Sequence, residues 1–355
     1  MELKNVKLLN ENFEFVNASI SFSEKIDAIK EEKNADEVYV IPGLVDVHTH
    51  AAIGTDAMDS DVALKSWTDY MHKNGITTFF PSTVTGTPEE IVECVKRLKD
   101  ADGLNIEGPF LSKAKKGAHV EELIIPVDLD LMEKIKDKAV ITTVAPEVEG
   151  NMEKIPKLVK MGIKVAVGHS GADYETAKKA FSLGATQVTH IYNTMNPYLH
   201  RDPGIIGAAL ENDNVFCEAI CDGFHLHESV VRNLYKTIGP DRMVMISDAM
   251  RATGLCDGTY TLGGLDVYVK DGKARLIDGT IAGSTSNLMD MVKSAHSFGI
   301  PFTDCVKMAS LTPARSVGME KTIGSIEVGK LANLVVLDKD LNILDVYYKG
   351  EKVKR

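Results

Sequence analysis

The chain has 355 residues, of which 51 are acidic and 40 are basic, so its formal net charge is −11. This surplus of negative charge argues against a protein that binds nucleic acid or an anionic membrane, because both surfaces would repel it. Hydrophobic residues make up 44% of the chain, and glycine and proline occur at ordinary frequencies, which excludes disordered and collagen-like proteins. No apolar run is long enough to span a membrane and residues 1–7 lack the apolar core of a signal peptide, so we expect a cytoplasmic globular protein.

Short strands are predicted at both ends of the chain. Near the N-terminus they occupy residues 6–9, 14–16 and 38–41, and near the C-terminus they occupy residues 334–337 and 343–348. Isolated strands are only marginally stable, so we expect the two ends of the chain to pair. The sequence therefore predicts a small β-sandwich domain built from residues 1–43 and 316–355.

Between these ends, eight apolar and β-branched runs alternate with stretches of helical periodicity. The predicted strands are residues 44–48, 76–80, 104–107, 140–144, 164–167, 186–190, 215–220 and 243–247. One of the intervening helices is expected over residues 88–101, because Thr87 and Pro88 are typical of a capped helix start. Eight β/α units predict an α/β fold, a parallel (β/α)8 TIM-like barrel over residues 44–315. Residues 254–279, rich in glycine and threonine, indicate a β-hairpin inserted after the eighth strand.

Ionisable residues end or follow most of these predicted strands. They are His48, His50, Glu107, Glu147, His169, His190, His225 and Asp248. Enzymes with this fold build their sites from the C-terminal ends of the strands, so we expect these side chains to meet on one rim of the barrel. Imidazole and carboxylate ligands together favour zinc or iron(II) over magnesium or calcium. The sequence therefore predicts a site for a divalent transition metal, whereas Glu147 fits the pattern less well and is interpreted as structural.

The interpretation of His48 and His50 depends on their context. Two histidines separated by one residue share a face of a strand, yet such a pair also occurs in surface turns. Here an apolar strand delivers the pair into the barrel mouth, where Glu107, His169 and His190 also arrive. A carboxylate at the end of an apolar strand is costly unless it is paired or bound to metal. We therefore interpret these five side chains as metal ligands.

Asp248 ends the eighth predicted strand, opposite the predicted metal site. A carboxylate in this place can accept the proton of a metal-bound water and return it to a leaving nitrogen. The alternative is a helix cap, because serine and aspartate favour helix starts. Its position on the eighth strand favours the catalytic interpretation.

Several segments resemble known proteins. The segment Pro-Gly-Leu-Val-Asp-Val-His-Thr-His at 42–50 and the segment at 329–336 resemble the metal-dependent amidohydrolase superfamily. Within that superfamily, the motifs at 107–110, 116–119, 190–195, 222–225 and 282–284 resemble the N-acetylglucosamine-6-phosphate deacetylase family. The resemblance spans nearly the whole chain.

This resemblance implies hydrolysis of the acetamide of N-acetyl-D-glucosamine 6-phosphate to D-glucosamine 6-phosphate and acetate. It implies that Glu107, His169 and His190 are the main metal ligands. It also implies that His119 polarises the acetyl carbonyl and that Asp248 acts as base and then as acid. The substrate-binding residues that it implies are Ala118, Asn193, Thr194, Arg201, Asp222, Gly223, Phe224, His225, Ile281, Ala282 and Gly283.

The resemblance further implies a homodimer. Arg201 is the natural partner of the phosphate, because a guanidinium binds phosphate through two hydrogen bonds, and its loop is long enough to cross the interface. The number of metal ions stays open at one or two per subunit, because some family members lack the histidines that this chain has at 48 and 50. The carboxylated lysine of the superfamily is absent from strand four, so Glu107 is the residue left to bridge two ions.

Two other functions stay open at this point. A hydrolase of cyclic amides, of the dihydroorotase or hydantoinase kind, would use the strand-four lysine that this chain lacks and would not need a phosphate-binding arginine. A non-catalytic sugar-phosphate-binding protein could share the barrel, because a fold does not determine a function. The complete ligand set together with Asp248 argues against that second alternative.

Overall fold

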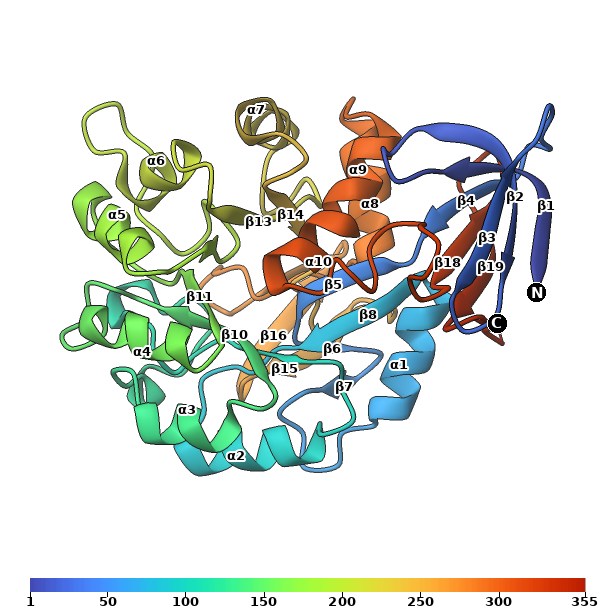
Figure 1. Cartoon of the computed structure of the whole chain (residues 1–355). Helices are drawn as coiled ribbons and strands as arrows, with labels where there is room; N and C mark the ends of the chain where they lie inside the picture. The colour runs from blue at the N-terminus through green and yellow to red at the C-terminus, as the bar shows by residue number, and fades with distance from the viewer. Residues whose placement is uncertain (355) are drawn as a thin grey trace.

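Eight parallel strands form a closed ring in the computed structural model, which describes residues 1–354 (Figure 1). They are β5 (Leu44–Thr49), β8 (Ile76–Pro81), β9 (Leu104–Ile106), β10 (Ala139–Val144), β11 (Lys164–Val167), β12 (Gln187–Val188), β13 (Phe216–Ile220) and β14 (Met243–Ile246). Strands β9 to β14 form one parallel sheet, β5 pairs with β8, and a bridge between Ser82 and Asn105 joins β8 to β9. The ring closes where the N–H of Asp248 donates to the carbonyl of His48 at 2.9 Å. The predicted (β/α)8 barrel is confirmed.

Helices pack against the outside of this ring (Figure 1). They are α1 (Leu64–Lys73), α2 (Pro88–Arg97), α3 (Leu129–Ile135), α4 (Ile155–Lys160), α5 (Tyr174–Ser182), α6 (Gly204–Leu210), α7 (Glu228–Ile238), α8 (Leu288–Ser297), α9 (Phe302–Met308) and α10 (Leu311–Val317). Helix α2 begins as predicted: the Thr87 hydroxyl accepts the N–H of Glu90, and the Glu90 carboxylate accepts the N–H of Thr87. It ends at Arg97 rather than at residue 101. Within residues 1–354, no helix combines the length and the apolar character needed to cross a lipid bilayer.

The barrel core lies between the ring and the helices. Its largest fully buried side chains include Trp67, Phe80 and Phe110. This packed core holds the strand ends, and the side chains that they carry, in fixed positions.

Shorter elements are the strands β6 (Ala51–Ala52) and β7 (Thr55–Asp56), and the 3-10 helices η1 (Lys113–Lys115), η2 (Glu121–Leu123) and η3 (Met152–Lys154).

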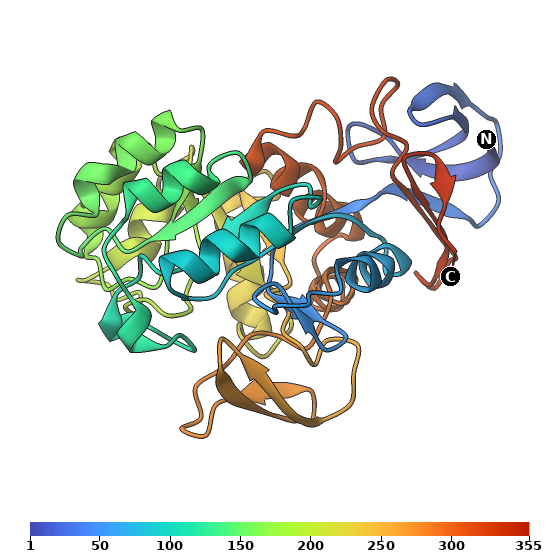
Figure 2. The ribbon, with the colours of Figure 1, turned by 90° about the horizontal axis from the view of Figure 1, so that it is seen from below.

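Both ends of the chain contribute to a second sheet (Figures 1 and 2). Its spatial order within residues 1–354 is β20 (Glu351–Lys352), β19 (Ile343–Tyr348), β18 (Leu334–Leu337), β4 (Tyr39–Pro42), β1 (Glu2–Leu9), β2 (Phe15–Phe22) and β3 (Ile26–Glu31). The sheet curls around its own apolar core, so that the N–H of Ile26 donates to the carbonyl of Lys330 at 2.9 Å. The sequence does not predict β3, because four of its six residues are exposed and three of them are charged. The predicted domain limit at 316 lies inside α10, which packs on the barrel, so the C-terminal part of this sheet begins after that helix.

A third, small sheet projects beside the barrel mouth (Figure 2). It consists of β15 (Gly258–Leu262), β16 (Leu265–Lys270) and β17 (Lys273–Arg275), all antiparallel, so the expected hairpin has a third strand. The chain turns back after β16 through Asp271 and Gly272, whose φ angles are 51° and 67°. The Asp257 carboxylate accepts the N–H groups of both turn residues.

Candidate active site

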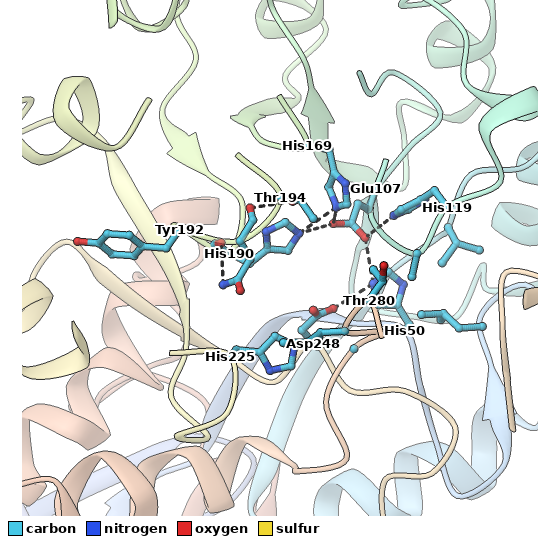
Figure 3. A pocket seen from close by; sticks show the side chains of 16 residues that line it. His50, Glu107, His119, His169, His190, Tyr192, Thr194, His225, Asp248 and Thr280 are labelled. Atoms are coloured by element: carbon cyan, nitrogen blue, oxygen red, sulfur yellow. Dashed lines mark hydrogen bonds and ion pairs between the residues drawn. The ribbon is translucent and has the colours of Figure 1, made fainter. Parts of the chain in front are cut away.

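Six of the eight ionisable residues predicted at the strand ends line one cavity in the C-terminal rim of the barrel (Figure 3). Its volume is about 280 Å³, and it is lined by His50, Val84, Glu107, Ala118, His119, His169, His190, Tyr192, Asn193, Thr194, His225, Asp248, Leu262, Thr280, Ile281 and Gly283. Sites for small molecules begin at roughly 300 Å³, so the cavity suits a small substrate. His48 lies beneath it without exposure, its Nε2 3.3 Å from that of His50.

Five of these residues, glycine aside, have backbone conformations that side chains rarely adopt. Two of them are Tyr192 and Thr194, and the φ angles of the other three are 46° at His169, 29° at His190 and 48° at Asp248. Each such residue costs about 1–3 kcal/mol and persists only where surrounding contacts hold it, which is typical of functional sites. Gly117 makes room for one of them, because a Cβ atom at Gly117 would lie 3.1 Å from the His169 ring. The strands β11, β12 and β14 therefore end in sharp turns that direct these side chains into the cavity.

Glu107, which follows β9, stands at the centre of the site (Figure 3). Its Oε1 lies 3.0 Å from His190 Nε2 and 3.2 Å from His169 Nε2. Its Oε2 lies 3.0 Å from His50 Nε2 and 3.5 Å from His48 Nε2. Each carboxylate oxygen thus faces a separate pair of imidazoles. This geometry fits a carboxylate that bridges two cations.

Asp248 approaches the same nitrogen of His50 as Glu107 does. Its Oδ1 is 3.2 Å from His50 Nε2 and 3.7 Å from His48 Nε2. The next helix along the described chain is α8, which begins at Leu288, so Asp248 caps no helix and that alternative is wrong. Its carboxylate is therefore free to act in the cavity.

Hydrogen bonds on the far side of two rings determine their tautomers. His50 Nδ1 faces the carbonyl of Ser82 at 3.2 Å, and His169 Nδ1 faces the carbonyl of Lys115 at 2.9 Å. A carbonyl only accepts hydrogen bonds, so both Nδ1 atoms carry a hydrogen and the neutral rings turn an Nε2 lone pair towards Glu107. This is the tautomer that binds a metal through Nε2.

The His48 ring has a different kind of partner. Its Nδ1 lies 3.0 Å from Oε2 of Glu218, a carboxylate in β13 that is 0% exposed. Glu218 is not among the residues predicted from the sequence, because it lies inside a strand rather than at its end. A charged residue within the apolar run Phe-Cys-Glu-Ala-Ile is the signal that could have identified it.

His119 has the opposite tautomer. The N–H of Thr85 donates to His119 Nδ1 at 3.1 Å, so this nitrogen accepts, and Nε2 carries the hydrogen in the neutral ring. His119 Nε2 lies 3.5 Å from Glu107 Oε2, on the cavity wall. The ring offers a hydrogen-bond donor rather than a metal ligand, although its atoms lie within 4.8 Å of ligand atoms of Glu107 and His169.

The charges of these buried groups stabilise one another. Burial by itself raises the pKa of Glu107, but the rings of His48 and His169 hold that pKa well below its usual range. Burial lowers the pKa of His169 to about 4, so its ring is neutral at pH 7. Burial also opposes charge on His50, yet hydrogen bonds with Asp248 and Glu107 raise its pKa to about 9. Burial by itself raises the pKa of Asp248, but the hydrogen bond with His50 outweighs burial and lowers that pKa to about 2. A divalent ion stabilises the same carboxylates and competes with the proton for His50 Nε2.

Two groups of buried donors could each hold one ion. The first donor group is Glu107, His169 and His190, and the second donor group is His48, His50 and Asp248. The ligand atoms of the second group all lie within 4.8 Å of one another. Imidazole nitrogen combined with carboxylate oxygen suits zinc or iron(II). The residues present therefore fit the metal that the sequence predicts.

The rest of the cavity wall comes from loops beyond the strands. The predicted substrate-binding residues that line it are Ala118, Asn193, Thr194, His225, Ile281 and Gly283. Asp222 lies behind this wall and orients His225: its Oδ2 is 2.7 Å from the ring Nδ1, and its Oδ1 accepts the N–H of His225.

Other predicted substrate-binding residues do not line the cavity. Gly223 and Ala282 lie outside its wall, and the Phe224 ring packs against the guanidinium of Arg275 in β17, 4.8 Å from the ring centroid. The cavity is also lined by four uncharged residues that were not predicted to bind substrate, namely Val84, Tyr192, Leu262 and Thr280. Of these, Tyr192 lies inside the motif at 190–195, and Leu262 belongs to the small inserted sheet.

Arg201 does not reach the cavity of its own chain. It is exposed, and within the described residues the side-chain partner of its guanidinium is the ring of His200, at 2.8 Å. The neighbouring Tyr198 and Leu199 are 54% and 52% exposed. The loop thus presents a cation beside apolar side chains at the surface.

Glu147 supports the site from outside the cavity. Its Oε2 accepts the hydroxyl of Ser170 and its Oε1 accepts the N–H of Gly171, both at 2.6 Å. Both partners directly follow His169. This carboxylate therefore holds the turn that presents His169, in agreement with its structural interpretation.

Comparison with known proteins agrees with this geometry. Residues 39–353 match the amidohydrolase family. The chain belongs to the amidohydrolase family. Among its relatives, the N-acetylglucosamine-6-phosphate deacetylase of Vibrio furnissii is 36% identical over 358 residues, which cover 95% of this chain and 89% of that protein. The N-acetylgalactosamine-6-phosphate deacetylase of Escherichia coli O157:H7 is 32% identical over 335 residues, covering 89% of this chain and 88% of that one.

Solved structures of this amidohydrolase family superpose on the whole chain. The N-acetylglucosamine-6-phosphate deacetylase of Thermotoga maritima has a TM-score of 0.95 at 35% identity, with 100% of both chains covered. A variant of the Mycobacterium smegmatis deacetylase in complex with N-acetyl-D-glucosamine-6-phosphate has a TM-score of 0.94 at 32% identity, covering 100% of this chain and 99% of that one. The family resemblance predicted from the sequence is confirmed. This chain is therefore an enzyme.

Proposed function

We propose that this amidohydrolase removes the acetyl group of N-acetyl-D-glucosamine 6-phosphate, giving D-glucosamine 6-phosphate and acetate. One observation carries the proposal: the cavity brings the first donor group together with a carboxylate, that of Asp248, and a ring N–H, that of His119. Amide hydrolysis needs an activated water, an acceptor for its proton and a donor to the carbonyl oxygen. The similarity to a deacetylase in complex with this sugar phosphate supports the choice of substrate.

Each reacting atom has a partner in this proposal. Glu107, His169 and His190 would hold a divalent ion, which would supply Lewis-acid activation of the attacking water. Asp248, kept ionised by His50, accepts a proton as the water adds to the acetyl carbon. His119 donates from Nε2 to the carbonyl oxygen as negative charge develops there, and the N–H of Thr85 preserves that tautomer. Asp248 then returns the proton to the nitrogen as the C–N bond breaks, and acetate and the amine leave.

The identity and number of the ions belong to the same proposal. We propose zinc or iron(II), because both accept imidazole and carboxylate ligands in open coordination sites. One ion is held tightly in the first donor group, and a second ion occupies the second group more weakly. The cytoplasmic location stays a prediction of the sequence.

Acetate release tests the proposed function directly. N-acetylglucosamine 6-phosphate should be hydrolysed with a kcat/KM roughly 10–100-fold higher than that of the unphosphorylated sugar, because a charge-assisted hydrogen bond contributes about 1.5–3 kcal/mol. Chelation should abolish the reaction, and added zinc or iron(II) should restore it. N-acetylgalactosamine 6-phosphate belongs in the same assay, because a relative of 32% identity is named for that epimer.

The same assay separates the alternatives. Hydrolysis of dihydroorotate or a hydantoin in place of the acetylated sugars would support a cyclic-amide hydrolase. Binding of the sugar phosphate by calorimetry without acetate release would support a non-catalytic protein. Either result contradicts the deacetylase proposal.

We also propose a homodimer in which Arg201 of each subunit contacts the phosphate in the neighbouring site. The exposed guanidinium and its distance from the cavity of its own chain support this arrangement. Replacing Arg201 with alanine should raise the KM for the phosphorylated sugar by roughly 10–100-fold and leave the unphosphorylated sugar unaffected, because the lost contacts are to the phosphate. Steady-state kinetics with both sugars measure the difference, and Arg201→Lys serves as the charge-preserving control.

A mixing experiment tests whether the arginine acts across the interface. Arg201→Ala and Asp248→Asn subunits are dissociated reversibly, mixed in equal amounts and reassociated. Half of the random pairs are then mixed dimers with one intact site each, so about a quarter of wild-type activity should return by symmetry. Absence of recovery would place Arg201 in the site of its own chain, and the deacetylase proposal would stand without the shared site.

A further inference from the structure

Glu218 is a buried carboxylate that the proposed reaction does not use. Its side chain is 0% exposed within β13. Its Oε2 lies 3.0 Å from His48 Nδ1 and accepts the backbone N–H of His190 at 3.3 Å. Its backbone carbonyl accepts the N–H of Ile191 at 2.8 Å. One residue therefore contacts a ring at the end of β5 and the turn that follows β12.

These contacts act on two features that metal binding depends on. At His48, a carboxylate that accepts the Nδ1 hydrogen turns the Nε2 lone pair towards the cavity and makes that nitrogen more basic. The corresponding partners of His50 and His169 are uncharged backbone carbonyls. At His190, whose φ angle is 29°, the hydrogen bond restrains a turn that would otherwise relax.

The burial of Glu218 is a separate observation. Other buried carboxylates in or beneath the cavity are those of Asp46, Glu107 and Asp248. Its Oε1 has no hydrogen-bond partner among the described residues. Burying an ionised carboxylate is costly unless positive charge lies nearby. A cation held by His48 and His50 would supply positive charge next to Glu218.

We infer that Glu218 is a positioning residue for a second divalent ion: it holds His48 ready to bind that ion. Its hydrogen bond to the His190 N–H also restrains the turn that presents His190 in the first donor group. This inference rests on the proposed metal-dependent function. It adds a residue to which neither the family motifs nor the strand-end pattern assigns a role.

Titration of the metal-free protein with Co²⁺, followed by its visible absorption, measures the effect. The wild-type chain should bind two equivalents in two steps. Glu218→Gln should weaken the second step about tenfold, and Glu218→Ala should weaken it by up to about 100-fold, because loss of such partners costs 10–100-fold in metal affinity. The glutamine keeps an acceptor for the His48 N–H and loses only the charge, so it should retain part of the affinity. The first step should keep its stoichiometry in both variants.

Two controls link the effect to His48. Cys217→Ala alters the adjacent buried residue on the other face of β13 and should leave both steps unchanged. In a His48→Ala background, Glu218→Gln should cause no further loss at the second step, because the side chain through which it acts is gone. Thermal unfolding of the metal-free proteins checks that each variant folds. If Glu218→Ala does not fold, the metal titration of Glu218→Gln alone tests the inference.

The outcomes distinguish this inference from the function on which it rests. A wild-type chain that binds no Co²⁺ contradicts the metal-dependent function itself. A wild-type chain that binds a single equivalent overturns the role of Glu218 and leaves the deacetylase proposal intact. The role of Glu218 is also overturned if the wild type binds two equivalents and Glu218→Gln binds the second as tightly. It is overturned as well if Glu218→Gln weakens the second step by the full amount in the His48→Ala background.

Discussion

Replacing Asp248 with asparagine is expected to lower kcat by about 10²–10⁴-fold, the usual contribution of general acid–base catalysis. An amide cannot accept the proton of the attacking water, yet it has the size of the carboxylate and keeps one oxygen facing His50. The first donor group does not include Asp248, so the tightly held ion should remain. KM for the sugar phosphate should change little, because the loss affects the transition state rather than binding. Steady-state acetate release together with metal analysis measures both quantities.

A matched substitution controls for the loss of a negative charge. Asp266→Asn makes the same chemical change at an exposed position on β16 and should leave kcat unchanged. If Asp248→Asn retained near-normal turnover, Asp248 would not be the proton acceptor. Glu147 would then be the next residue to examine, although its two oxygens already accept hydrogen bonds from Ser170 and Gly171.

Replacing His190 with alanine is expected to remove the tightly bound ion and, with it, activity. Its Nε2 lies 3.0 Å from Glu107 Oε1 and 3.1 Å from His169 Nε2, so it completes the first donor group. Without that ion the attacking water loses its Lewis acid, which is worth several kcal/mol of transition-state stabilisation. Metal content per subunit, measured after dialysis, should fall to the level of the chelated wild type.

Two further variants define the specificity of that result. The double substitution of His48 and His50 with alanine should remove the weaker ion and leave the tight site full. His227→Asn alters a histidine that caps α7 at the surface and keeps an acceptor there, so it should change neither site. A full tight site in His190→Ala would show that the first donor group is assigned to the wrong residues.

Much of the fold and the centre of the site could be predicted from local patterns. The eight barrel strands follow from apolar runs of a few residues, and the candidate ligands follow from their place at the ends of those runs. Both signals lie within about ten residues of sequence, so they do not depend on knowing which distant segments meet. The elements that the local pattern does not reveal have physical reasons as well. Four of the six residues of strand β3 are exposed, and β17 depends on a two-residue turn.

The chemical state of the site depends instead on contacts between distant residues. The hydroxyl of Ser247 donates to Asp46 at 2.6 Å across 201 residues of sequence and joins β14 to β5 beneath the cavity. Glu218 meets His48 across 170 residues, and Thr85 meets His119 across 34. No sequence motif predicts these contacts, because the closure of the barrel brings the two residues of each pair together.

The sequence by itself therefore determined the barrel, the family and the residue types gathered on its rim, since periodicity and strand ends are local properties of the chain. Only the tertiary structure decided which histidines turn a lone pair towards Glu107 and which one turns an N–H towards it. That difference follows from the partner at the far side of each ring: a backbone carbonyl or carboxylate fixes a ligand, and the N–H of Thr85 fixes a donor at His119. The roles of these four histidines are set by atoms that the packed barrel places behind them.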